Sequence, residues 1–228
     1  MFFDPMYLVI VGPALILSIV AQVWVKRSFA HYSQIGTQSG LSGAEVAQRI
    51  VDQAGLGVKV ERVGGFLSDH YDPRSRVLRL SPEVYDGRSI SSVGVAAHES
   101  GHALQHARGY LPLQWRTAMV PITTIGSNLA WPLLMIGFIF GALSLVKIGI
   151  IFFAAAVVFQ LVTLPVEFDA SRRAVAVLRN QAMVSAIELN GVEKVLTAAA
   201  MTYVAAAAAA VLQLLYFLMR AGLLRRHD

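Results

Sequence analysis

Residues 7–25 read YLVIVGPALILSIVAQVWV and contain no charged side chain. A helix needs about 20 predominantly apolar residues to cross the hydrocarbon core of a bilayer. The residues before this segment include an acid and no base, and no A-x-A cleavage site follows it. We therefore expect a membrane anchor at 7–25 rather than a cleaved signal peptide.

Further apolar segments follow the first one. Lys147 divides residues 118–166 into two of them, 118–143 and 148–166, which we expect to form a transmembrane hairpin. Residues 195–219 are uncharged and include a run of alanines, whose small side chains favour close helix packing in lipid; the alternative is a buried soluble helix. Of the 228 residues, 56% are hydrophobic and 14% are charged, whereas about 25% are charged in typical soluble domains. The composition predicts a mostly α-helical membrane protein with about four transmembrane helices.

The distribution of positive charge predicts the orientation of the chain. Residues 26–116 hold 11 Lys and Arg and residues 167–194 hold four, whereas the segment around Lys147 has one and the N-terminus has none. The positive-inside rule places both basic segments in the cytoplasm and the N-terminus outside. With four crossings the basic C-terminal tail lies outside as well, which conflicts with the positive-inside rule. Either this tail is an exception to the rule or the last segment does not fully cross the membrane. The net charge of +5 reflects this bias, and nothing in the chain resembles a nucleic-acid-binding module.

Residues 26–117 have the pattern of a small soluble α+β domain. The stretch SGAE at 42–45 forms a capping box, which predicts a helix over 43–54. Residues 58–63 and 76–80 alternate apolar and polar side chains as strands do.

A second helix, predicted from the serines at 89–92 to Gly109, carries the pattern His98-Glu99-x-x-His102. Residues four apart lie on one helix face, so two imidazoles can reach one Zn²⁺. A glutamate beside that face can take a proton from metal-bound water. The alternative is two surface histidines on an ordinary helix, but the predicted helix and the small residues around the motif favour zinc.

A catalytic zinc needs a third protein ligand and one open position. The chain has no cysteine, so this ligand is His, Asp or Glu. The metzincin continuation is excluded because Gln105 and Arg108 stand where that motif has glycine and histidine. Glu167 is the best candidate, since we expect it to open a new helix over 167–194 on the same membrane face as the histidines. Asp169 is the alternative ligand, unless it only complements the helix dipole.

Three stretches together resemble a known family: AAHESGHALQH at 96–106, LSDHYDPRSRVLRLS at 67–81 and LPVEFDASRRA at 164–174. They are similar to the bacterial membrane zinc metallopeptidases of the YugP-like group, distant relatives of the HtpX-type and CAAX-prenyl-type membrane endopeptidases. The likeness covers most of the chain, from the first apolar segment to the last.

The resemblance implies one Zn²⁺ per chain, bound by His98, His102 and Glu167. It also implies that Glu99 is the catalytic base, as in gluzincin-type HExxH…E peptidases. An integral protein of the bacterial inner membrane is expected, with its active site on the cytoplasmic side. The wider HtpX-type pattern has aspartate where this chain has Ser171.

Other polar residues have two interpretations each. His70 or Tyr71 can donate a hydrogen bond to the oxyanion of a tetrahedral intermediate, or can belong to a turn at Asp-Pro. The strand at 76–80 can offer its edge to an extended peptide, or can simply be a hairpin strand. Arg172 and Arg173 can bind a substrate carboxylate or a neighbouring acid, or can anchor the chain at the membrane interface.

The predicted architecture is thus about four transmembrane helices and a small α+β zincin-like cytoplasmic domain that carries the HExxH helix. The predicted function is a membrane-embedded zinc endopeptidase in which Glu99 activates water. The alternative is a membrane scaffold or adaptor with a structural zinc or none. Expected partners are membrane lipid and a protein or peptide substrate, with assembly into an oligomer or with a membrane protein left open.

Overall fold

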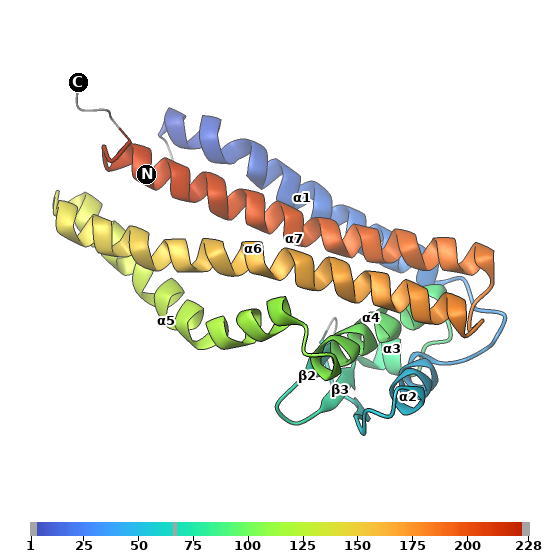
Figure 1. Ribbon diagram of the computed structural model, residues 1–228. Helices are drawn as coiled ribbons and strands as arrows, with labels where there is room; N and C mark the ends of the chain where they lie inside the picture. The colour runs from blue at the N-terminus through green and yellow to red at the C-terminus, as the bar shows by residue number, and fades with distance from the viewer. Residues whose placement is uncertain (1–3, 66–67, 225–228) are drawn as a thin grey trace. The chain divides into compact units, whose positions relative to one another are not determined.

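Figure 1 shows the computed structural model of the chain, which describes residues 4–65 and 68–224. Most of the described residues are helical. The elements in chain order are α1 (Pro5–Ser33), α2 (Gly43–Gln53), β1 (Lys59–Arg62), β2 (His70–Asp72), β3 (Val77–Leu80), α3 (Pro82–Tyr85), α4 (Ile90–Ala107), α5 (Leu111–Ile139), α6 (Leu143–Asn180) and α7 (Ala186–Arg220). Arg225 and Arg226 of the basic C-terminal tail lie outside the described residues.

Four of the described helices, α1, α5, α6 and α7, are long and apolar enough to cross a membrane. Their presence confirms the predicted mostly helical class with four candidate spans and a small mixed sheet. The capping box predicted for α2 is also present, with the Ser42 hydroxyl accepting from the Glu45 N–H and the Glu45 carboxylate accepting from the Ser42 N–H. Ser89 caps α4 in a similar way by accepting from the Ser92 N–H.

The long helices extend beyond the apolar segments that predicted them. α1 continues to Ser33 through Lys26 and Arg27, because a helix does not have to end where its apolar residues end. The turn between α5 and α6 lies at residues 140–142 rather than at Lys147, which is inside α6. Gly141 has a φ of +66° at this turn, the left-handed conformation in which helices commonly end.

The prediction that a new helix opens at Glu167 is wrong, because α6 runs without interruption from Leu143 to Asn180. Pro165 lies inside this helix, where it removes one backbone hydrogen-bond donor but does not end the helix. Residues 167–194 therefore include the end of α6 and the start of α7. Glu167 therefore lies on the same helix as the apolar segment before it.

The chain forms two compact units, each made of separate segments. Unit 1 contains residues 1–21, 114–164 and 202–228, and unit 2 contains residues 22–113 and 165–201. In unit 1, Tyr216 and Phe217 are fully buried in an apolar cluster with Val11, Leu134, Val146 and Ile150. Many large apolar residues on its surface are exposed, including Val9, Ile122, Phe140 and Ile151, as contact with lipid would require.

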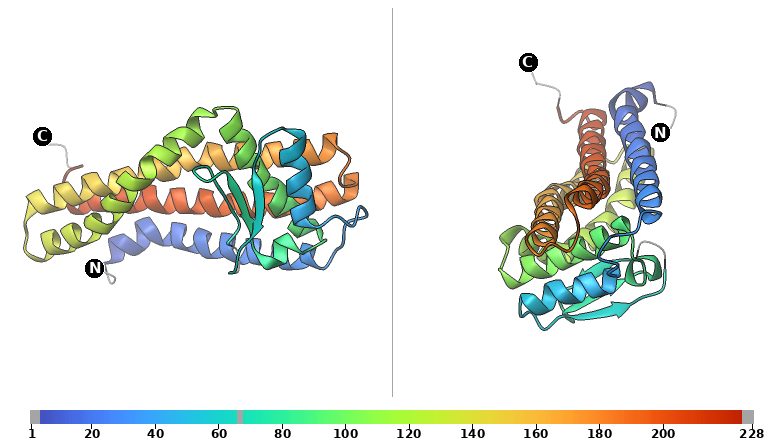
Figure 2. Two further views of the ribbon diagram at one scale, coloured as in Figure 1. Left: turned by 90° about the horizontal axis from the view of Figure 1, so that it is seen from below. Right: turned by 90° about the vertical axis from the view of Figure 1, so that its right-hand side faces the viewer.

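Unit 2 is built around α4, which packs against other elements on two sides. One buried cluster joins α4 to α2, α6 and α7, and a second joins it to α2, α3 and the sheet. Figure 2 shows α2 and the sheet beside α4. Of the residues between Ile90 and Ala107, only four are not buried. This burial fixes α4 as the central support of the candidate site.

The small sheet has the strand order β1-β3-β2, with β1 parallel and β2 antiparallel to β3. The strands predicted at 58–63 and 76–80 correspond to β1 and β3. The expectation that 76–80 offers a free edge is wrong, because β3 is the central strand and is paired on both sides. The outer edges of the sheet belong to β1 and β2. The short strand β2 includes His70 and Tyr71, for which a turn was the alternative interpretation.

Candidate metal centre

α4 and α6 approach each other closely at the candidate site. Gly101 lies between Glu99 and His102 on α4, and a Cβ atom placed on it would lie 2.5 Å from the carbonyl oxygen of Ala170 on α6. Only glycine allows the two backbones to come this close. The approach brings the residues after Pro165 next to the two histidines.

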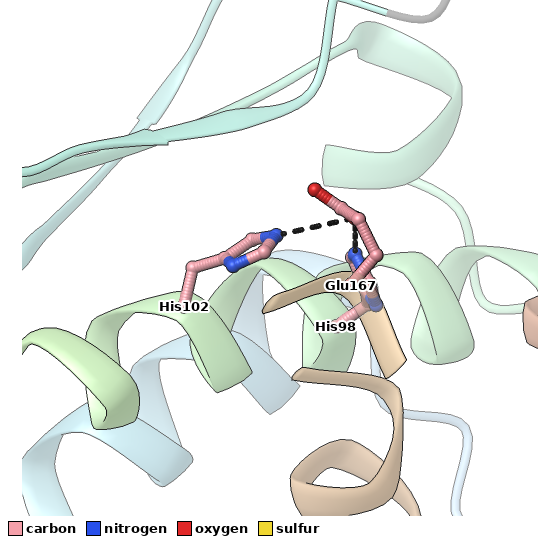
Figure 3. A group of neighbouring side chains, drawn as sticks. All are labelled: His98, His102 and Glu167. Atoms are coloured by element: carbon pink, nitrogen blue, oxygen red, sulfur yellow. Dashed lines mark hydrogen bonds and ion pairs between the residues drawn. The ribbon is translucent and has the colours of Figure 1, made fainter. Parts of the chain in front are cut away.

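Figure 3 shows the imidazoles of His98 and His102 pointing from α4 toward the carboxylate of Glu167 on α6. The Nε2 atoms of His98 and His102 lie 3.2 and 3.7 Å from Oε2 of Glu167. The ligand atoms offered by the three residues all lie within 4.8 Å of one another. Glu167 is buried, with a side-chain exposure of 2%. Among the described residues, these three form the candidate metal-binding group that the structure offers.

The donor atoms fit a zinc ion. Zinc binds imidazole nitrogen and carboxylate oxygen at about 2.0–2.1 Å, which places two tetrahedral ligand atoms about 3.4 Å apart. The measured nitrogen–oxygen distances of 3.2 and 3.7 Å lie on either side of that value. Both imidazoles also have a hydrogen-bond partner at Nδ1, so each presents Nε2 to the common point. A set of two histidines and one carboxylate leaves room for a further ligand, as catalytic zinc sites require.

Each histidine is oriented by a different polar residue. Nδ1 of His98 lies 3.1 Å from the hydroxyl of Ser171, one turn after Glu167 on α6. Nδ1 of His102 lies 3.0 Å from Oε1 of Gln105. Ser171 therefore contacts the histidine from the position where the wider HtpX-type pattern has aspartate. Such contacts fix ring orientation and tautomer at metal sites.

The surrounding charges favour the protonated form of His102. Burial by itself lowers the pKa of His102, but the hydrogen bond that its imidazole donates to Glu167 and the negative charges of Glu99 and Glu167 outweigh it and raise the pKa above the ordinary 6.5. The site therefore attracts a positive charge, either a proton or a metal ion.

Asp169, the alternative third ligand, is bound elsewhere. Its carboxylate accepts hydrogen bonds from Nε of Arg173 at 2.5 Å and from Nε2 of Gln105 at 2.9 Å. Arg173 in turn lies over the ring of Tyr110, 5.7 Å from its centroid. Of the interpretations given for Arg173, the structure shows contact with a neighbouring acid. The geometry thus favours Glu167 over Asp169 as the third ligand.

Glu99 lies beside the two histidines on α4 and is 9% exposed. Within the described part of the chain its carboxylate makes no hydrogen bond or ion pair, so it is available to a water molecule or a substrate. The negative charge of Glu99 also affects the pKa of Asp69. Burial raises the pKa of Asp69, hydrogen bonds from Ser81 oppose the rise, and the charge of Glu99 adds to it.

His70 and Tyr71 lie on β2 and are not part of the metal-binding group. His70 is exposed, and its Nδ1 lies 2.7 Å from the carbonyl oxygen of Ser68. The hydroxyl of Tyr71 lies 2.9 Å from Nδ1 of His106, one turn after His102 on α4. Burial raises the pKa of Tyr71, so its hydroxyl keeps its proton and remains a donor. An oxyanion role for either residue stays a prediction.

Sequence reasoning did not identify Gln105 as a functional residue. It noted Gln105 only as a departure from the metzincin motif. The signal was its place three residues after His102, on the same helix face. The position of its partners on α6 could not be read from the sequence.

Comparison with known proteins identifies the family of the chain. Residues 7–222 match a family described as "Putative neutral zinc metallopeptidase". The chain is also 51% identical over 207 residues to the "Putative membrane protease YugP" of Bacillus subtilis (strain 168), covering 90% of this chain and 92% of that protein. No solved structure matches the chain. The predicted resemblance to the YugP-like group is confirmed, and the chain belongs to this family of zinc metallopeptidases.

Proposed function

We propose that the chain is a membrane endopeptidase that hydrolyses peptide bonds at the cytoplasmic face of the bacterial inner membrane. The observation that carries this proposal is that His98, His102 and Glu167 lie close together beside Glu99. The carboxylate of Glu99 makes no hydrogen bond or ion pair with the described residues. A structural zinc site needs ligands but no free base. A buried acid without a protein partner beside the ligands is what peptide hydrolysis requires.

In the proposed mechanism His98, His102 and Glu167 would hold the zinc. When bound there, the ion would act as a Lewis acid that polarises the scissile carbonyl and makes water acidic enough to attack near neutral pH. Glu99 accepts a proton from the attacking water and passes it to the nitrogen of the leaving amine. Ser171 and Gln105 keep the two imidazoles in position during these proton transfers.

We expect the substrate to be an extended peptide. Among the described strands, β2 pairs only with β3, so its outer edge has unused backbone donors and acceptors. A peptide that pairs with this edge would lie in the sheet that packs on α4. The edge first proposed at 76–80 is therefore replaced by the edge of β2.

The proposed cytoplasmic location rests on charge. Residues 26–116 carry 11 of the 19 Lys and Arg, and the positive-inside rule places such a segment in the cytoplasm. Membrane lipid is then a partner of the four apolar helices.

The substitution Glu99→Gln tests the catalytic proposal. It removes the base but keeps the size of the side chain, so we expect cleavage of casein or a model peptide in detergent to be abolished while bound zinc is retained. Glu83→Gln on α3, an exposed glutamate, is the matched control and should cleave like the wild type. If the wild type contains zinc but cleaves nothing, or if Glu99→Gln still cleaves, the scaffold alternative replaces the proposed mechanism.

A further inference from the structure

Gln105 is a fully buried amide on α4 that connects the two helices of the metal centre. Its exposed fraction is 0%. Nε2 donates to the carbonyl oxygen of Val166 at 2.8 Å and to Oδ2 of Asp169 at 2.9 Å. Oε1 lies 3.0 Å from Nδ1 of His102. Both ends of the amide are therefore used, and both of its contacts on α6 lie within two residues of Glu167.

The partners of Gln105 determine which way its amide points. A backbone carbonyl and a carboxylate are both acceptors, so the group that faces them must be the NH₂. The end that faces His102 is then the carbonyl oxygen, which can only accept. His102 must donate from Nδ1, and in the neutral ring this leaves the lone pair on Nε2. That nitrogen is the one that lies 3.7 Å from Oε2 of Glu167.

The contacts beyond Gln105 hold this arrangement. Asp169 receives Nε of Arg173 at 2.5 Å, so a guanidinium offsets its charge. Tyr110 covers the guanidinium of Arg173 and its hydroxyl donates to the carbonyl oxygen of Pro165 at 3.4 Å. The donor side of Gln105 is thus anchored on the same turn of α6 that presents Glu167.

We infer that Gln105 is a positioning residue for His102. It selects the His102 tautomer with a free Nε2 and fixes the position of the imidazole relative to Glu167. It also links the imidazole to Asp169 through its amide, whereas in other metal sites a carboxylate contacts the histidine directly. The inference rests on the proposed zinc site. A glutamine that served only to pack α4 on α6 would give the same burial but would not control the tautomer.

Two substitutions separate positioning from packing. Gln105→Met keeps the length and volume of the side chain but removes all three hydrogen bonds. Gln105→Glu keeps an acceptor for His102 and, when it shares a proton with Asp169, a donor as well. The full chain is purified in detergent, and its zinc dissociation constant is measured against a competing chelator. Gln48→Met on α2, where the amide binds only the exposed Asp52, is the matched control.

We expect Gln105→Met to weaken zinc binding by about 10- to 100-fold, the usual effect of losing a residue that orients a ligand. Gln105→Glu should stay within about fivefold of the wild type, because with the shared proton it keeps an acceptor for the imidazole N–H and a donor toward Asp169. The control Gln48→Met should bind zinc as the wild type does. Wild-type affinity in Gln105→Met, or equal losses in the Met and Glu variants, would overturn the inference.

Nitrogen NMR of histidine-labelled protein provides a second test that does not depend on how the variants fold. In the zinc-free wild type, at a pH well above the pKa of His102, we expect the proton on Nδ1. A proton on Nε2 there would overturn the inference. A wild type that binds no zinc would instead remove the proposed site, and the inference with it.

Discussion

The close approach of α4 and α6 gives a quantitative prediction for Gly101→Ala. The new Cβ would lie 2.5 Å from the carbonyl oxygen of Ala170 and 3.1 Å from its carbonyl carbon, and ordinary contact begins at 3.4 Å. Both neighbours are backbone atoms, so no side chain can rotate away. The helices must separate locally by about 0.9 Å to relieve the contact with the oxygen.

This separation should affect zinc binding more than it affects the stability of the protein. Overpacking costs about 1–3 kcal/mol, but replacing glycine by alanine inside a helix returns about 1 kcal/mol. The free energy of unfolding should therefore fall by about 2 kcal/mol at most. The site is more sensitive, because Nε2 of His98 now lies 3.2 Å from Oε2 of Glu167, close to the separation that one zinc bridges. A displacement near 1 Å can cost about 100-fold, so we expect a loss of zinc affinity of that order.

The assay is a chelator-competition titration of zinc, with thermal unfolding of the same samples. Gly94→Ala is the matched control on α4, because its Cβ would meet only the side chain of Val192, at 3.2 Å. It should keep wild-type zinc affinity. If Gly101→Ala binds zinc as tightly as the wild type, α4 and α6 do not need this spacing and the argument from Gly101 is wrong.

Two further predictions concern the metal directly. Glu167→Ala should lose bound zinc in elemental analysis. Asp169→Asn should keep zinc with lower affinity, because Asp169 contacts the site through Gln105. If Glu167→Ala retained zinc and Asp169→Asn lost it, Asp169 and not Glu167 would be the third ligand. The raised pKa of His102 means that the folded zinc-free protein binds this proton more tightly than the unfolded chain does. Its contribution to stability is therefore fully present below pH 6.5 and is lost as the pH rises through the raised pKa. Zinc binding needs the neutral imidazole and should weaken over the same range as the pH falls, so melting curves with and without zinc should shift in opposite directions; parallel shifts would contradict this.

Local patterns predicted the parts of the chain whose structure depends on nearby residues. The capping box at Ser42 and Glu45 and the spacing of His98 and His102 each follow from helix geometry within one turn. The apolar segments predicted the long helices for the same reason, since hydropathy is a local property. These predictions needed no knowledge of distant contacts.

The features that sequence reasoning missed depend on residues far apart in the chain. β2 is only three residues long and exists because it pairs with β3, so no local pattern marks it. α6 continues past Pro165 to Asn180, so the helix start that we predicted at Glu167, directly after the apolar segment, is absent. Gln105 becomes informative only when Val166 and Asp169, some 60 residues away, are known to face it.

The charges explain why this buried site suits a divalent metal. Glu167 and Glu99 are 2% and 9% exposed, and each contributes one negative charge. Asp169 adds no net charge, because Arg173 lies 2.5 Å from it. Ser171 occupies a position where an aspartate would add another negative charge beside His98. Two carboxylates offer the charge that balances one Zn²⁺, and balanced charge favours burial. In the zinc-free chain the raised pKa of His102 lets a proton on its imidazole offset part of that negative charge.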